Sequence, residues 1–94
     1  MPSKEFKITV TVRGVVQGVG FRYYVMRHAG KAFVKGFVKN LYNGDVYLEA
    51  EGSEENLKEL IAAVKKGPYG SHVIDAVTEW HESKNEFNNF EIRH

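Results

Sequence analysis

A glycine-rich segment is the first part of the chain whose residue types suggest chemistry. It reads Gly14-Val15-Val16-Gln17-Gly18-Val19-Gly20-Phe21-Arg22. It lies between an expected strand and an expected helix, and such turns leave backbone N–H groups free to bind an anion. Its glycine spacing differs from the dinucleotide fingerprint, and it lacks the Gly-Lys-Ser/Thr ending of a nucleotide P-loop. The segment therefore predicts a site for a single phosphate-like group.

The position of Arg22 in the first turn of the expected helix strengthens this prediction. A cation in the first turn of a helix opposes the helix dipole, at a cost of about 0.3–1 kcal/mol. The placement is reasonable if an anion is bound between the loop and the guanidinium, whose fork matches two phosphate oxygens. A glycine-rich turn beside an ordinary surface arginine is the alternative, and spacing alone leaves it open.

A second segment, Gly36-Phe37-Val38-Lys39-Asn40, is followed by Gly44. Asn40 falls at the end of an expected strand. Its amide can accept a hydrogen bond from a water and donate one to another oxygen, so it could aim a nucleophile. Asparagine also starts turns often, and on spacing alone that simpler explanation is favoured.

Hydrophobic periodicity indicates the elements that must position these residues. Strands are expected over 6–12, 34–39, 46–51, 72–82 and 90–93, and helices over 21–32 and 54–66. Asn43-Gly44 predicts a hairpin turn, while Ser53 and Gly67 cap the second helix. This order predicts an α+β, ferredoxin-like β-α-β-β-α-β sandwich, with one mainly antiparallel sheet, two helices on one face and a short last strand.

The amino-acid composition excludes several classes of function. The chain has 94 residues, which allows a single domain over 1–94, and its net charge of +1 gives no case for a nucleic-acid partner. It contains no cysteine, which excludes disulfides, thiolate metal sites and a cysteine nucleophile. No apolar run approaches the ~20 residues of a membrane span. Met1-Pro2-Ser3 leads into a strand pattern and not into an apolar signal core, so we expect a cytoplasmic protein.

Other titratable and aromatic residues are weaker candidates. The four histidines show no paired ligand spacing, so no metal is expected. His28 could be a general base, but a surface or satisfied core histidine is the favoured interpretation. Asp75 and Glu79 are expected on a solvated strand face. Trp80 and the five tyrosines are expected in the core or on the sheet surface.

Taken together, the two segments resemble the acylphosphatase family. Gly14 to Arg22 matches the family signature Gly-x-Val-Gln-Gly-Val-x-Phe-Arg in full, and Gly36 to Gly44 matches the second signature. The interval between them, Gly67-Pro68 and the closing Phe90-x-Ile92 also agree. The resemblance extends over essentially the whole chain.

The resemblance implies an enzyme that hydrolyses the carboxyl–phosphate bond of acyl phosphates, with Arg22 and Asn40 as catalytic residues and no metal or cofactor. The phosphate would be held by Arg22 and by the backbone amides of Gln17, Gly18, Val19, Gly20 and Phe21. Two departures stand out. Many relatives carry a basic residue in place of Val15 and a glycine near Phe33.

Two other functions remain as alternatives. One is a non-hydrolytic phosphate-binding domain of the same family that serves in carbamoyl transfer. Because such domains usually begin a longer chain, a free-standing enzyme is favoured, and a monomer is expected by default at this chain length. The other is an RNA-binding ferredoxin-like module, since Lys35-Gly36-Phe37-Val38 is similar to the aromatic motif of such modules. That motif belongs on the third strand, however, and here it lies on the second.

Overall fold

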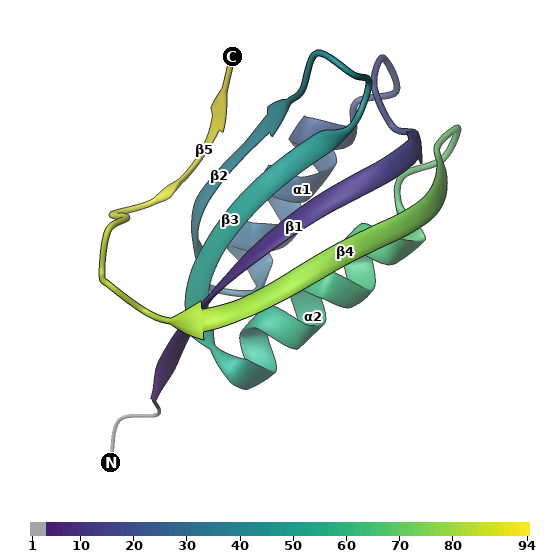
Figure 1. Ribbon diagram of the computed structural model, residues 1–94. Coiled ribbons are helices and arrows are strands. Elements are labelled where there is room, and N and C mark those ends of the chain that lie inside the picture. The colour runs from purple at the N-terminus through teal and green to yellow at the C-terminus, as the bar shows by residue number, and fades with distance from the viewer. Residues whose placement is uncertain (1–3) are drawn as a thin grey trace.

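The computed structural model describes residues 4–94 and consists of five strands and two helices (Figure 1). The expectation about a leader sequence rests partly on residues 1–3, which lie outside the described residues. The elements follow the predicted order: β1 (Glu5–Val15), α1 (Phe21–Lys31), β2 (Lys35–Asn40), β3 (Val46–Ser53), α2 (Glu54–Lys66), β4 (His72–Glu82) and β5 (Phe90–Arg93).

The strands form one sheet in the order β4-β1-β3-β2-β5. All neighbours are antiparallel except β2 and β5, which are parallel. Both helices cover the same face of the sheet (Figure 1). The ferredoxin-like α+β prediction is therefore confirmed.

The core lies between the sheet and the helices. Alternate residues of β1 and β3, including Ile8, Val10 and Leu48, are fully buried, as expected for strands with one covered face. Helix α2 contributes Leu57 and Leu60 from its apolar stripe. Ser53 caps the N-terminus of α2 as predicted, since its hydroxyl accepts a hydrogen bond from the Asn56 N–H at 3.2 Å.

Strand β1 is longer than predicted. Periodicity ended the strand at Val12 and began the glycine-rich loop at Gly14, but pairing with β4 continues to Val15 across a β-bulge between Arg13 and Gly14. A bulge breaks the period of two, so alternation in the sequence stops before the strand does. The connection to α1 is thereby shortened to residues 16–20.

Helix α1 ends one residue earlier than predicted, in a Schellman motif. The Val34 N–H donates to the Ala29 carbonyl at 3.1 Å and the Phe33 N–H to the Gly30 carbonyl at 3.4 Å. This motif requires a left-handed residue, usually glycine, and Phe33 occupies that position with φ 56° and 82% exposure. Phe33 therefore adopts a backbone conformation that is strained for a residue with a Cβ, and its exposed ring adds little packing in return.

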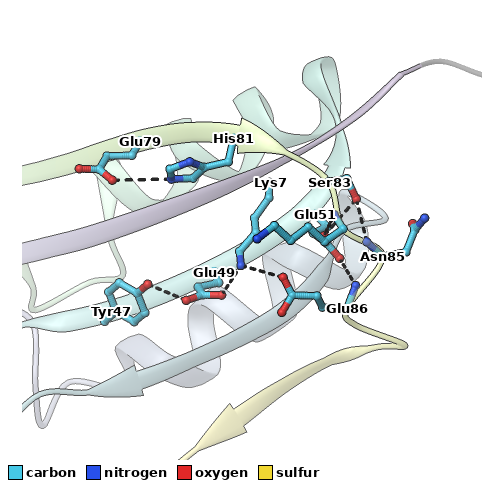
Figure 2. A network of polar contacts seen from close by, with 10 residues as sticks. Lys7, Tyr47, Glu49, Glu51, Glu79, His81, Ser83, Asn85 and Glu86 are labelled. Carbon is cyan, nitrogen blue, oxygen red and sulfur yellow. Dashed lines mark hydrogen bonds and ion pairs between the residues drawn. The ribbon is translucent and has the colours of Figure 1, made fainter.

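Glu51 fixes the segment that connects β4 to β5. Its carboxylate, 3% exposed, accepts hydrogen bonds from the Lys84 N–H at 2.8 Å, the Ser83 hydroxyl at 3.0 Å and the Glu86 N–H at 3.0 Å (Figure 2). Burial alone would raise the pKa of Glu51, but these hydrogen bonds outweigh it and hold the pKa below its usual range.

Beside Glu51, Lys7 forms ion pairs with Glu49 at 3.0 Å and Glu86 at 3.1 Å (Figure 2). Burial would lower the pKa of Lys7, but its two carboxylate partners raise it. The sheet face away from the helices is thus closed locally by its own polar network.

Replacing Phe33 tests the strain at the end of α1. We expect Phe33→Gly to raise the free energy of unfolding by about 1 kcal/mol, because glycine adopts positive φ without a Cβ clash. Urea denaturation measures the change. Phe33→Ala is the matched control, since it removes the exposed ring but keeps the Cβ. An equal gain in both variants would assign the effect to the ring.

Glu51→Gln tests the connection between β4 and β5. We expect it to lower the free energy of unfolding by about 1–3 kcal/mol near neutral pH, since an amide turns N–H groups toward backbone donors. Because the folded pKa of Glu51 is lowered, its contribution is present above the ordinary value of 4.5 and disappears as pH falls through the folded value. Urea titrations down to acidic pH should therefore show the difference shrinking. The exposed Glu59→Gln should show neither effect.

Candidate active site

The sheet brings the two predicted site segments to one end. Val46, at the start of β3, lies opposite both Val12 of β1 and Asn40 of β2. The β1–α1 loop and the β2–β3 turn therefore emerge beside each other (Figure 1). Strand pairing alone thus places Asn40 near the glycine-rich loop, although they are far apart in sequence.

The loop turns into α1 through two glycines in the left-handed conformation. Gly18 has φ 76° and Gly20 has φ 75°, and neither would clash with an added Cβ. Their conformation, and not lack of space, is what favours glycine. Gly20 caps α1 without a side-chain hydrogen bond, and the first turn, within the described residues, has no acidic side chain. The positive end of the helix dipole is left for an external anion.

One cavity of about 370 Å³ lies at this helix start. Five of the seven predicted site residues line it, namely Gly18, Gly20, Phe21, Arg22 and Asn40. The other two do not: Val19 packs against the core and the Gln17 side chain points to the β2–β3 turn. Only the backbone amides of these two residues can serve the predicted role.

Gln17 links the two halves of the site. Its Nε2 donates hydrogen bonds to the carbonyls of Leu41 and Asp45, both at 2.8 Å. The same turn is closed by the Leu41 N–H, which donates to the Asp45 carbonyl at 2.8 Å. The glycine-rich loop is therefore attached directly to the turn that follows Asn40.

The charges around the cavity favour an anion. Within the described part of the chain, its only charged lining side chain is Arg22, with His94 beside it. The Arg22 Nη1 lies 3.3 Å from His94 Nδ1, a hydrogen bond to a neutral imidazole and not an ion pair. The guanidinium thus keeps an uncompensated positive charge at the cavity wall.

Sequence reasoning missed four lining residues: Val16, Tyr23, Ile92 and His94. Tyr23 was assigned to the core or the sheet surface, and this prediction is wrong. It is exposed on α1, and Tyr42 and Tyr69 are exposed as well. Nothing local in the sequence signals the role of His94, because it reaches the site only through the parallel pairing of β5 with β2.

The weaker candidates lie away from the cavity. The His28 ring packs on Tyr24, with centroids 4.4 Å apart. Burial first, and then the charges of Lys31, Arg27 and Lys66, lower the pKa of His28. Asp75 and Glu79 are exposed on β4, as predicted, and Val15 is exposed outside the lining.

Residues 4–94 hold no cluster of three or more side chains suited to a metal ion. Over the same range, neither helix is long and apolar enough to cross a membrane.

Phe37, which carried the resemblance to RNA-binding modules, is covered. It is 6% exposed and lies under the Arg93 guanidinium, 4.1 Å from its ring centroid. The Phe87 ring packs edge-on against Phe37, with ring centroids 5.9 Å apart. RNA-binding sheets of this topology stack bases on open aromatic rings, and Phe37 does not offer one.

Known proteins resemble this chain along most of its length. The acylphosphatase family model matches residues 8–92. The acylphosphatase of Salinibacter ruber is 38% identical over 89 residues, which cover 95% of this chain and 94% of the relative. The crystal structure of acylphosphatase from Bacillus subtilis superimposes with a TM-score of 0.92 at 38% identity, over 95% of this chain and 99% of that one.

A larger protein contains a similar unit. The crystal structure of full-length HypF in a phosphate- and nucleotide-bound form matches all of this chain, with a TM-score of 0.87 and 29% identity, but the match spans only 12% of that protein. The family model and the relatives of similar length cover nearly every element described above. The chain belongs to the acylphosphatase family.

Proposed function

We propose that this protein hydrolyses acyl phosphates to a carboxylate and phosphate, with Arg22 and Asn40 as its catalytic residues. The observation that carries the proposal is the convergence of the Gly18–Gly20 turn, Arg22 and Asn40 on one cavity whose described lining residues include no acidic side chain. Each group suits one part of a phosphoryl transfer, and none of them needs a metal or another cofactor.

The phosphoryl group is held by the helix start. Backbone N–H groups from Gln17 to Phe21 and the Arg22 guanidinium donate to its oxygens, where negative charge is spread in a loose transition state. The start of α1, which has no side-chain cap, and the Arg22 guanidinium, which has no acidic side chain beside it in the cavity lining, support this role. Positioning and charge stabilisation then supply most of the rate.

Asn40 orients the attacking water. The water oxygen forms a bond to phosphorus while the bond from phosphorus to the acyl oxygen breaks, and the carboxylate leaves with that electron pair. The water proton passes to the phosphate oxygens of the substrate. Because a carboxylate is a good leaving group, the reaction needs no strong general acid, and the described cavity lining contains no acidic side chain.

We infer the wider setting from the sequence patterns. Residues 1–94 form one domain that acts as a monomer in the cytoplasm on a small-molecule acyl phosphate, without a nucleic-acid or membrane partner. The burial of Phe37 supports the exclusion of RNA. Sedimentation of the purified protein measures its oligomeric state directly.

Hydrolysis of benzoyl phosphate in the presence of a chelator tests the assignment. We expect turnover in the wild type and a loss of about 10²–10³-fold in Arg22→Ala and Asn40→Ala. Arg22→Ala should also lose phosphate affinity, whereas Asn40→Ala should keep it, because it removes only the water contact. Arg22→Lys should lose most activity, since a point charge replaces the fork.

Arg27→Ala is the matched control, because Arg27 is exposed on the same helix outside the cavity lining. Near wild-type turnover in Asn40→Ala would refute its role. A folded wild type that binds phosphate without turnover would favour the second candidate, a non-hydrolytic phosphate-binding domain. The similarity to a unit of HypF supports that candidate.

Gln17 should act as a positioning residue. We expect Gln17→Glu to lower kcat about tenfold or more, because a carboxylate faces two carbonyl oxygens and detaches the Asn40 turn from the loop. Steady-state kinetics with benzoyl phosphate measure this loss. Gln17→Ala, which removes the donors without adding charge, should lose less. Equal, unchanged turnover in both variants would show that strand pairing alone positions Asn40.

A further inference from the structure

Two neighbouring tyrosines of α1 differ in what they contribute to the fold. The Tyr24 hydroxyl donates a hydrogen bond to the Ala63 carbonyl at 2.7 Å, and the Tyr24 ring packs against Phe21. Within residues 4–94, the Tyr23 ring pairs with no other aromatic ring and its hydroxyl forms no hydrogen bond. Tyr23 is 61% exposed and lines the cavity at the start of α1. Its place at the cavity, and not packing of the fold, therefore points to its role.

The cavity has more room than a phosphoryl group needs. Its volume of about 370 Å³ falls within the range of about 300–1,000 Å³ that is typical of pockets for whole small molecules. Four of its lining side chains are largely apolar, namely Val16, Phe21, Tyr23 and Ile92. Part of the acyl group of a substrate therefore fits into the same cavity, beside the phosphoryl group.

The direction of the acyl group follows from the geometry of phosphoryl transfer, in which the attacking and leaving oxygens lie in line on opposite sides of phosphorus. Asn40, which orients the attacking water in the proposed mechanism, ends strand β2. Ile92 reaches the cavity from β5, the parallel neighbour of β2. The leaving oxygen therefore points away from this sheet wall and toward the wall formed by α1, which covers one face of the sheet (Figure 1).

Tyr23 is the side chain of the α1 wall that is available to the acyl group. Phe21 is buried in the core, and Arg22 holds the phosphoryl oxygens in the proposed mechanism. Among the described lining residues of α1, only Tyr23 presents an exposed aromatic ring. Such a ring packs well against another flat, apolar group in a stacked or edge-on arrangement. The described lining has no acidic side chain that would favour a cationic acyl group instead.

We propose that Tyr23 determines which acyl phosphates the site prefers, by packing its ring against the acyl group that leaves. This inference rests on the proposed function, because the in-line argument starts from the role of Asn40. It narrows the substrate class: acyl phosphates with a planar, apolar acyl group, such as an aromatic one, bind more tightly than those with a small acyl group, such as acetyl.

A second cavity offers the alternative place for the acyl group. It has a volume of about 420 Å³, shares Asn40 and His94 with the first cavity, and is also lined by Leu41 and Tyr42. Because these residues belong to the sheet side of the site, the in-line geometry places the second cavity on the side of the attacking water. Tyr42 is exposed like Tyr23 and is therefore its matched control.

Calorimetry with two phosphonates tests the inference. Phenacylphosphonate and acetonylphosphonate carry a methylene group in place of the bridging oxygen of benzoyl phosphate and acetyl phosphate, so binding is measured without hydrolysis. We expect the wild type to bind phenacylphosphonate about five- to tenfold more tightly than acetonylphosphonate, through ring burial and aromatic contact. Tyr23→Ala should reduce this ratio to about twofold or less, because the aromatic contact is lost. Tyr23→Phe, which keeps the ring, and Tyr42→Ala should retain the wild-type ratio.

Three outcomes would overturn the inference. One is an unchanged ratio in Tyr23→Ala. Another is loss of the preference in Tyr42→Ala, which would place the acyl group in the second cavity. The third is a folded wild type that shows no preference between the two phosphonates or binds neither of them.

Steady-state kinetics separate this inference from the proposed function. With turnover, Tyr23→Ala should raise KM for benzoyl phosphate about fivefold more than KM for acetyl phosphate, with little change in kcat, because the ring contact is made equally in the ground and transition states. A binding preference that depends on Tyr23, in a protein without turnover, would support the inference and reject the hydrolase. Turnover without any binding preference would reject the role of Tyr23 alone.

Discussion

The site depends on holding one loop against one turn from a different strand. Residues 16–20 supply the anion-binding amides, and Asn40 comes from the end of β2, two strands away in the sheet. The β1–β3–β2 pairing brings the loop and Asn40 to the same end of the sheet. The two hydrogen bonds from Gln17 to the turn carbonyls then fix the position of the loop relative to the turn. Because a slip of one residue would move every strand side chain to the other face, the buried core also protects the site geometry.

The two faces of the sheet serve this end in different ways. The helix-covered face supplies a close-packed core and, through α1, the helix start that forms the cavity floor. The other face is closed in part by the segment 83–89. The Glu51 carboxylate holds this segment (Figure 2), and the Phe87 ring packs against Phe37. That segment leads into β5, whose parallel pairing with β2 carries Ile92 and His94 to the cavity. The contacts that hold segment 83–89 on this face therefore also determine where Ile92 and His94 meet the cavity.

Acidic side chains and the cationic cavity occupy different parts of the sheet. Acidic side chains such as Glu49 and Glu86 gather around Lys7 on the face away from the helices, toward the end of the sheet that lies away from the cavity, and form ion pairs with it (Figure 2). The cavity at the sheet end has Arg22 and His94 and, among its described lining residues, no acidic side chain. With a net charge of only +1, the chain attracts an anion by local arrangement and not by overall charge. This suits a small phosphorylated substrate better than a polyanion.

Local patterns in the sequence determined much of this protein. The bounds of α2, β4 and β5 follow from caps and alternation, since those signals report which face of each element is buried. The residue types of the two motifs also single out Arg22 and Asn40. Only the tertiary structure decided where the Gln17 amide points and that His94 meets Arg22, and only there does Phe33 show its left-handed backbone. The Gln17 and His94 contacts join residues distant in sequence, and periodicity within one element carries no information about its partner. At Phe33 the motif is local, but the glycine that usually marks a left-handed backbone is replaced by phenylalanine, so the residue type gives no signal.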